Sequence, residues 1–489
     1  MNALVYVGLD IGTTSIKVAA VNKQLEAVFE KQYAYEYQTP QKGWTEINPD
    51  TWVELAMQGL KELFHQIPAD TVKAIGVTGQ MHTTVFVDKH GFSVRPAILW
   101  NDNRTKESLP AIKQKLESRK KTKHLAKIVS TGSPLASLLW VRQHEPEQYD
   151  QIHKFLIAKD YVKLKLTDTY TTDYCDASTS SLYDLHNGCW SKDVQELFDF
   201  SQGMYPEIHP ASTIVGELSR EVCTALSIEE PIPVVSGSGD NVASALASGS
   251  FETGQPLLSL GTSGVVVIPN SQYQLKQIGK NVVAKLTEED DSIITQGTVQ
   301  AGAKINSWWL ENILQTADYT SEQATIPSDR LGENDVFFFP HMNGEKTLFS
   351  NPNLRGAFIG LSLETTRTDM YLAVLEGLAF GLRQLFEAMK NEERPEYFAI
   401  VGGGAKSDLW IKICANVLGY PIKRVQTCQE AVHGAAILAI MGVEDSFTFP
   451  KSKAQWTEPN PTIVAKYNQR YKNYLKLSQQ LVLLGGDGK

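Results

Sequence analysis

Residues 4–21 read LVYVGLDIGTTSIKVAAV, and this run indicates the class of fold. The apolar stretch Leu4 to Leu9 predicts a strand, Gly12 to Thr14 predicts a tight turn, and Ile16 to Val21 predicts a returning strand. Together they predict a β-hairpin whose turn carries glycine and hydroxyl side chains.

The same plan recurs half a chain later. Residues 256–268 read PLLSLGTSGVVVI, again an apolar strand, a Gly-Thr turn and an apolar strand. An internal repeat at this separation indicates two similar domains, and we expect residues 1–245 and 246–489 to form them. Helical patterns over 301–314, 368–390, 407–418, 431–441 and 463–483, with a strand-like run at 397–401, predict α/β layers.

Composition limits the partners. The chain has 489 residues, and its 46 basic and 55 acidic side chains give a formal charge of −9, so no nucleic-acid partner is expected. Its five cysteines are odd in number and scattered, which favours reduced thiols in a cytoplasmic protein. No apolar run approaches the length of a membrane span, so no membrane association is expected.

The two Gly-Thr turns are candidate phosphate sites. Backbone N–H groups in such turns can hold an anion, as at Gly12, Thr13 and Thr14 and at Gly261, Thr262 and Ser263. Asp10 could face a metal ion through water, and Lys17 is a candidate contact for the transferred phosphate; an ordinary hairpin and a solvated lysine are the structural alternatives. Neither the phosphate-loop motif G-x-x-x-x-G-K-[ST] nor a complete G-x-G-x-x-G fingerprint occurs in the sequence.

Asp240 is the candidate general base. It follows the apolar run 232–235 and the glycine-rich residues 236–239, which places a carboxylate at the carboxyl end of a strand, where ligands gather in α/β sheets. The alternative is a helix N-cap.

Two further segments are candidate ligand contacts. Gln80-Met81-His82 lies between two apolar runs and is interpreted as a polar pair within a strand that meets a partner or a ligand; a histidine in such a place is more often structural, which is the alternative for His82. Trp100-Asn101-Asp102 offers a ring for stacking and polar groups for hydroxyls, with a core tryptophan as the alternative.

These motifs, in this order, resemble the FGGY carbohydrate kinases. Residues 10–14, 239–241, 261–263 and 402–405 are similar to that family's first phosphate motif, catalytic acid, second phosphate motif and adenosine motif, and residues 356–376 are similar to its second signature. The resemblance implies a two-lobed α/β ATPase fold of the actin and hexokinase type (ribonuclease H-like). In that fold the sugar lies deep in a central cleft and ATP lies mainly on the second lobe.

Carried over by residue, the resemblance implies roles for individual side chains. Asp240 would be the base, and magnesium would lie near Asp10 and Asp240. The implied sugar contacts are Met81, His82, Trp100, Asp240 and Asn241. The implied nucleotide contacts in the second half of the chain are Gly302, Asn306, Gly403, Gly404, Ala405 and Asp408.

The stretches 78–82 and 96–102 are most similar to the xylulose-directed members. The implied reaction is transfer of the ATP γ-phosphate to a terminal hydroxyl of a ketopentose, D-xylulose giving D-xylulose 5-phosphate. Lys346, Leu348 and the pair Thr83-Thr84 depart from the family pattern and leave gluconate, ribulose and other polyols open as substrates. A non-catalytic actin-like binding protein and a plain ATPase are rival functions, and a homodimer is one candidate assembly.

Overall fold

The computed structural model describes residues 4–249, 255–261, 263–270, 278–345, 347–349, 351, 353–390, 394–425, 430–449 and 455–485. The chain forms two compact units. The first comprises residues 1–249, 281–293 and 428–450, and the second comprises 250–280, 294–427 and 451–489. A division at 245/246 would give residues 281–293 and 428–450 to the second half of the chain, whereas in the structure they belong to the first unit.

The first unit is built on a mixed sheet that begins with the predicted hairpin. Strand β1 runs antiparallel to β2, with Asp10 opposite Lys17, and parallel to β5. The sheet order is β13-β14-β5-β1-β2-β3, with β15 also paired to β5. Its strands are β1 (Val5–Ile11), β2 (Ser15–Asn22), β3 (Ala27–Ala34), β5 (Val72–Gly79), β13 (Ile214–Glu217), β14 (Pro233–Val235) and β15 (Ser238–Gly239).

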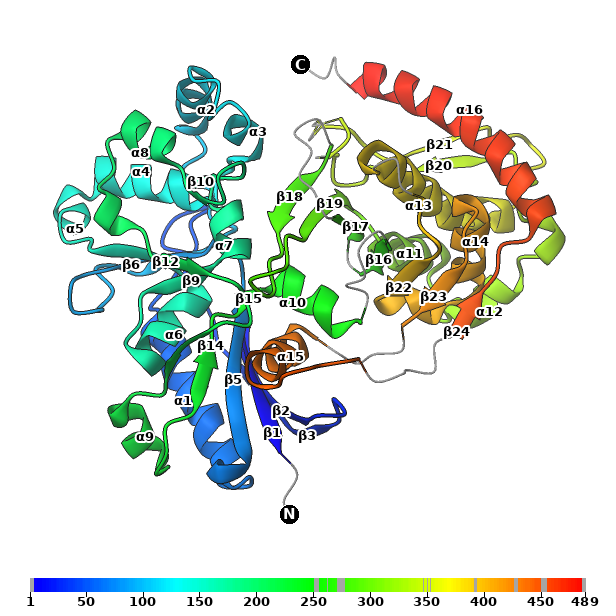
Figure 1. Ribbon diagram of the computed structural model, residues 1–489. Helices are drawn as coiled ribbons and strands as arrows, with labels where there is room; N and C mark the ends of the chain where they lie inside the picture. The colour runs from blue at the N-terminus through cyan, green and yellow to red at the C-terminus, as the bar shows by residue number, and fades with distance from the viewer. Residues whose placement is uncertain are drawn as a thin grey trace. The chain divides into compact units, whose positions relative to one another are not determined.

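Helix α15 (Ala431–Val443) packs tightly on one face of this sheet (Figure 1). A Cβ atom at Gly8 would lie 1.9 Å from the Val432 carbonyl oxygen, and one at Gly76 would lie 1.9 Å from the Ala435 carbonyl oxygen. Because only glycine allows so close an approach, alanine at either position would push the helix away from the sheet. The opposite face is covered by α1 (Asp50–Phe64), with α6 (Ala158–Thr167) and α9 (Arg220–Leu226) also in this unit.

The rest of the first unit is a smaller layered region. A second sheet has the order β4-β7-β6-β8, and two short strand pairs accompany it. The sheet consists of β4 (Glu46–Ile47), β6 (Thr84–Val87), β7 (Ala97–Ile98) and β8 (Lys154–Ile157). The two pairs are β9 (Thr171–Asp173) with β12 (Glu207–His209), and β10 (Tyr183–Asp184) with β11 (Cys189–Trp190). Its helices are α2 (Leu109–Glu117), α3 (Leu125–Ile128), α4 (Pro134–His144), α5 (Pro146–Tyr149), α7 (Tyr174–Thr179) and α8 (Lys192–Phe198).

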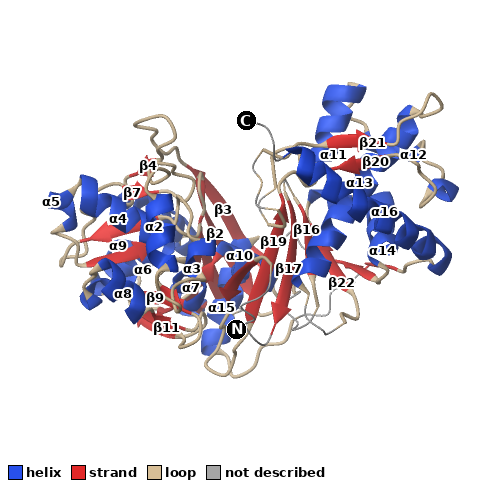
Figure 2. Cartoon of the chain, turned by 90° about the horizontal axis from the view of Figure 1, so that it is seen from above, coloured by secondary structure: helices blue, strands red, loops and turns tan. Residues whose placement is uncertain are grey.

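The second unit repeats the sheet plan of the first, with helices beside its strands (Figure 2). Strand β16 is antiparallel to β17 and parallel to β22, as β1 is to β2 and β5. The predicted second hairpin is therefore confirmed. The strands of the second half of the chain are β16 (Leu257–Leu260), β17 (Gly264–Asn270), β18 (Lys280–Val283), β19 (Ile293–Val299), β20 (Phe337–Phe339), β21 (Ala357–Ile359), β22 (Phe398–Val401), β23 (Ile422–Arg424) and β24 (Gln455–Thr457). Of these, β18 beyond Lys280 belongs to residues 281–293 of the first unit.

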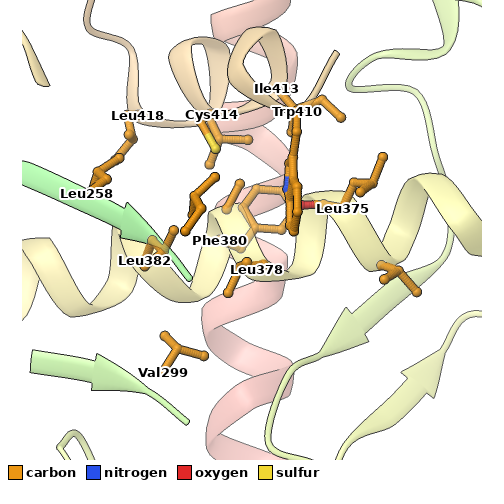
Figure 3. Packing of buried hydrophobic residues seen from close by; sticks show 14 of the residues in the cluster. Leu258, Val299, Leu375, Leu378, Phe380, Leu382, Trp410, Ile413, Cys414 and Leu418 are labelled. Atoms are coloured by element: carbon orange, nitrogen blue, oxygen red, sulfur yellow. The ribbon is translucent and has the colours of Figure 1, made fainter. Parts of the chain in front are cut away.

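Long helices build the core of the second unit. Trp410 and Cys414 on one helix pack against Leu375 and Leu378 on another, and the Trp410 indole N–H donates to the Leu375 carbonyl oxygen at 3.0 Å (Figure 3). The helices are α11 (Lys304–Trp308), α12 (Tyr319–Ala324), α13 (Arg367–Met389), α14 (Asp408–Leu418) and α16 (Pro461–Gly485). The predicted helix over 301–314 is α11 followed by a π-helical turn, Trp309–Leu314. Of the helices in the described ranges, none combines the length and apolar character needed to cross a bilayer.

Candidate active site

Three strands of the first unit end side by side at one edge of the sheet. Ile11 at the end of β1 is paired with Gly79 at the end of β5, and Gly79 is paired with Gly239 at the end of β15. These strands are mutually parallel, so their carboxyl ends share an edge. The turn 12–14, the segment 80–83 and Asp240 therefore all leave the sheet at that edge, where α/β sheets bind ligands.

The first Gly-Thr turn is held by hydrogen bonds to its peptide groups. Gly12 N–H donates to the Ser15 carbonyl oxygen at 3.0 Å. The Gly12 carbonyl oxygen accepts from Gln80 Nε2 at 3.2 Å and from the Tyr35 hydroxyl. This fixes the turn and ties it to the segment that carries Met81 and His82.

Asp10 lies at the start of this turn, where burial disfavours the ionised form of its carboxyl group. Its Oδ1 atom is buried and makes no hydrogen bond within the described part of the chain. Burial raises the pKa of Asp10 from its ordinary 3.8 to about 6, against the opposing attraction of Lys17. Lys17 itself forms an ion pair with Glu430, so here its ammonium group contacts a carboxylate of the same unit.

The segment Gln80-Met81-His82 is not within a strand, contrary to the sequence interpretation. Strand β5 ends at Gly79 and β6 begins at Thr84, so these residues form a loop. His82 has a φ of 68°, the left-handed conformation that a non-glycine residue seldom adopts. The side chain of Met81 lies against Gly239, where an added Cβ would be 2.7 Å from Met81 Cγ.

Trp100 is not a core residue: 48% of it is exposed. Its indole N–H donates to Thr13 Oγ1 at 3.0 Å, and its backbone N–H donates to Thr83 Oγ1 at 3.1 Å. Trp100 is thus attached to the first Gly-Thr turn and to the loop after His82.

Asp102 has a structural role that the sequence interpretation missed. It is fully buried, pairs with Arg104 at 2.8 Å and accepts from Thr45 N–H at 2.6 Å. Its carboxylate is therefore committed to protein groups rather than to sugar hydroxyls. Asn101 Oδ1 also accepts a hydrogen bond from Thr45, at 2.9 Å.

Asp240 is the first residue of α10 (Asp240–Ala247), and Gly239 is the N-cap. The N-cap alternative for Asp240 is therefore wrong. A carboxylate in the first turn of a helix is stabilised by the helix dipole and by the free backbone N–H groups there. Asn241, the next residue, is exposed.

A buried group of charges lies behind β15. Lys159 Nζ contacts Asp160, Asp173 and Asp176 at 2.6, 2.8 and 3.2 Å. All these side chains are at most 2% exposed, and burial raises the pKa of Asp176 well above its ordinary value.

This buried group also holds the strand that leads to Asp240. Lys163 donates to the Ser236 carbonyl oxygen at 2.7 Å, and Ser238 Oγ donates to Asp173 Oδ2 at 3.3 Å. Burial lowers the pKa of Lys163 to about 8. The bonds from Lys163 and to Asp173 therefore hold residues 236–239 in place, and with them the first residue of α10.

The second unit contains a pocket of about 410 Å³ beside its own Gly-Thr turn. Four of the residues assigned to the nucleotide by resemblance line it: Gly261, Asn306, Gly403 and Gly404. A Cβ at Gly403 would meet no atom within 4 Å, so this glycine leaves open space for a ligand. The pocket therefore lies between Gly261 of the second Gly-Thr turn and the glycines Gly403 and Gly404.

The other described residues that were assigned to the nucleotide do not line this pocket. Ser263 Oγ donates to the Gln300 carbonyl oxygen at 3.4 Å. A Cβ at Gly302 would lie 2.1 Å from the Ser263 carbonyl carbon, so Gly302 allows α11 to approach the turn. Ala405 is buried, and Asp408 is paired with Arg424. Thr262 lies outside the described residues, as does Lys346.

Sequence reasoning did not find several lining residues. They are Lys304, Ser307, Tyr319, Lys406, Ser407 and Trp410. Lys406 and Ser407 directly follow the Gly-Gly-Gly-Ala motif, and that proximity was the available signal. Tyr319 is brought to the pocket by α12, and no local pattern marks it.

Comparison with known proteins agrees with the motifs. The N-terminal domain of the FGGY family of carbohydrate kinases matches residues 5–247, and the C-terminal domain of the same family matches residues 257–443. A xylulose kinase of Staphylococcus epidermidis is 31% identical over 497 residues, covering 99% of this chain and 98% of the relative. A gluconokinase of Bacillus licheniformis is 24% identical over 491 residues, covering 97% and 95%.

The fold has the same relatives. The crystal structure of a xyloylose kinase from Brucella ovis superposes with a TM-score of 0.88 at 27% identity, covering 98% of this chain and 100% of that one. The two-domain α/β fold of the expected type is thereby confirmed. With both family domains matched in order along most of its length, the chain belongs to the FGGY family of carbohydrate kinases.

Proposed function

We propose that this carbohydrate kinase transfers the γ-phosphate of ATP to a terminal hydroxyl of D-xylulose, giving D-xylulose 5-phosphate. The observation that carries the proposal is the shared edge of β1, β5 and β15. There a phosphate-type turn, a loop with Met81 and His82, and the carboxylate of Asp240 lie on adjacent strand ends.

Asp240 is the proposed general base. It accepts the proton of the sugar hydroxyl as that oxygen forms a bond to the γ-phosphorus and the bond from phosphorus to the β,γ-bridging oxygen breaks, releasing ADP. Its place at the first turn of α10, directly after an anchored strand, holds the carboxylate in a fixed position. Met81, His82, Trp100 and Asn241 are the proposed sugar contacts.

The nucleotide is proposed to bind in the pocket of the second unit. Gly403 leaves room for the nucleoside, and Gly261 of the second Gly-Thr turn lines the same pocket. Lys304 and Lys406 add positive charge to the lining, which suits a polyanionic ligand. A cytoplasmic location belongs to the same proposal, because ATP is the phosphoryl donor.

Magnesium is proposed to bind near Asp10 and Asp240. The buried Oδ1 of Asp10 makes no hydrogen bond among the described residues, so a cation would satisfy it. Within the described ranges no three His, Cys, Asp or Glu residues form a metal-binding group. A magnesium ion held by one or two carboxylates, phosphates and water would not need such a group. When bound, it would neutralise charge on the phosphates.

The choice of D-xylulose rests on the relatives and on the sequence stretches around Met81 and Trp100. The relative named xylulose kinase is 31% identical, against 24% for the gluconokinase. The test is ADP release, measured with D-xylulose, gluconate, ribulose and glycerol and without sugar. D-xylulose should give the highest kcat/KM. Faster turnover of gluconate would reject the substrate, and ADP release independent of any sugar would indicate a plain ATPase.

A further inference from the structure

A buried chain of hydrogen bonds connects two walls of the nucleotide pocket. It starts at the N-cap of α14, where Trp410 N–H donates to Ser407 Oγ at 3.1 Å. Ser407 Oγ donates to Gln323 Oε1 at 2.6 Å, and Gln323 Nε2 donates to the Tyr371 hydroxyl oxygen at 3.3 Å. The Tyr371 hydroxyl donates to Asn306 Oδ1 at 2.7 Å.

The donors and acceptors along this chain agree in direction from one end to the other. A backbone N–H can only donate, so the Ser407 hydroxyl accepts from Trp410. Its own proton has the Gln323 amide oxygen as acceptor. Gln323 then presents its oxygen to Ser407 and its NH₂ to Tyr371. Tyr371 accepts from Gln323 and sends its own proton to Asn306. Because burial raises the pKa of Tyr371 to about 12, the phenol keeps that proton at any working pH.

In this arrangement the last member, Asn306, presents its amide oxygen to Tyr371. With Oδ1 committed to Tyr371, Asn306 has its NH₂ group left for other partners, and no hydrogen bond among the described residues uses it. Asn306 lines the pocket, as does Ser407 at the other end of the chain. Tyr371 and Gln323 are 1% and 8% exposed, so they reach the ligand only through their neighbours.

We propose that Tyr371 and Gln323 are positioning residues that hold the Asn306 amide with its N–H donor toward the nucleotide. The amide then recognises a hydrogen-bond acceptor on the nucleoside, either a ring nitrogen of the base or a ribose hydroxyl oxygen. The inference rests on the proposed function, in which this pocket takes ATP. The inference explains why Asn306, in the pocket lining, acts toward the nucleotide as a hydrogen-bond donor rather than as an acceptor.

The first test is Tyr371→Phe, which removes one hydroxyl and leaves the ring. Asn306 can then rotate its amide, and the loss of one oriented hydrogen bond should weaken ADP binding, measured by calorimetry, by about 3- to 10-fold. The KM for ATP should rise alike, while kcat at saturating ATP and the KM for the sugar stay unchanged.

Tyr467→Phe is the matched control. The Tyr467 hydroxyl is also buried and donates to Glu376 on α13, the helix that carries Tyr371, at 2.9 Å, but Tyr467 does not line the pocket. Both variants should lose thermal stability, and only Tyr371→Phe should lose ADP affinity. Equal affinity in wild type and Tyr371→Phe, or equal losses in both variants, would overturn the inference. Failure of the wild type to bind ADP would instead overturn the proposed function.

Asn306→Asp tests the donor directly and does not depend on the behaviour of Tyr371→Phe. It keeps the acceptor for Tyr371 and replaces the N–H donor by a carboxylate oxygen. Adenosine, which has no phosphate to repel that charge, should bind about 10-fold or more weakly. Unchanged adenosine affinity would refute the assignment.

Deoxy analogues separate the two acceptors. If the amide donates to a ribose oxygen, the ratio of wild-type to Asn306→Asp affinity should fall to about one for 2′-deoxyadenosine or for 3′-deoxyadenosine. If that ratio persists with both analogues, the acceptor is on the base.

Discussion

Replacing Asp10 by asparagine should make the ligand-free protein more stable at neutral pH. The pKa of this carboxyl is about 6 in the folded protein against an ordinary 3.8. At about 1.4 kcal/mol for each tenfold change in proton affinity, this difference corresponds to about 3 kcal/mol of destabilisation by the ionised form. The asparagine amide still lacks a buried partner, which costs about 1 kcal/mol or more. The net gain expected at pH 8 is therefore about 1–2 kcal/mol.

The pH dependence fixes the sign of this effect. A carboxyl whose pKa is raised on folding binds its proton more tightly in the folded state. Its contribution to stability is therefore complete below pH 3.8 and is lost as the pH rises through about 6. The advantage of Asp10→Asn should be full at pH 8 and should shrink by about 1 kcal/mol or more at pH 5.

Urea unfolding of both proteins at the two pH values measures this directly. Asp88→Asn is the control with opposite sign, because Asp88 Oδ1 accepts from His90 N–H and Phe92 N–H at 2.8 and 3.0 Å. An Asp10→Asn variant that is less stable than wild type at pH 8, or whose advantage does not change with pH, would refute the argument from burial. The same variant should bind magnesium and ATP poorly, so stability and function should change in opposite directions.

Three further outcomes are expected. Asp240→Asn should lower kcat by about 100-fold or more while calorimetric affinities for sugar and ADP stay near wild type, because the amide cannot accept the proton; activity within a few-fold of wild type would remove Asp240 as the base. His82→Ala should raise the KM for D-xylulose about 10-fold with little change for ATP, whereas equal losses for both substrates would indicate a structural histidine. Since burial lowers the pKa of Lys163 to about 8, folding stability should rise between pH 8 and 9.5 by on the order of 1 kcal/mol per pH unit, and the slope should disappear in Lys163→Met; an unchanged slope would contradict the charge state assigned to Lys163.

Local pattern was enough for much of the fold. Alternating apolar residues around a Gly-Thr turn predicted both hairpins, and helical spacing predicted α13, α14, α15 and α16 to within two residues at each end. The same reasoning misplaced Gln80 to His82, because apolar runs on both sides concealed the end of β5 at Gly79. An apolar pattern shows that a segment is buried but not which surface it covers. The sequence pattern therefore could not assign α15 to the first unit.

The candidate site divides in the same way. Glycines and short motifs marked Gly261, Gly403 and Asp240, because backbone approach needs particular residue types. Tyr319 and the bonds from Ser407 to Asn306 arise from packing between distant helices, and no local spacing encodes them. Asp102 shows the converse error, since a polar side chain next to an exposed ring was taken for a ligand contact and is an internal ion pair.

The position of α15 has a consequence for synthesis on the ribosome. Three of the strands that it contacts, β1, β2 and β5, are complete by Gly79, whereas the helix begins only at Ala431, roughly 350 residues later. At about 5–20 residues per second, the nascent chain carries that bare sheet face for about 20–70 s. During this interval the face is available to chaperones and to neighbouring nascent chains. A fragment that ends at residue 249 would keep it uncovered permanently, so the first unit becomes a finished domain only when almost the whole chain has been translated.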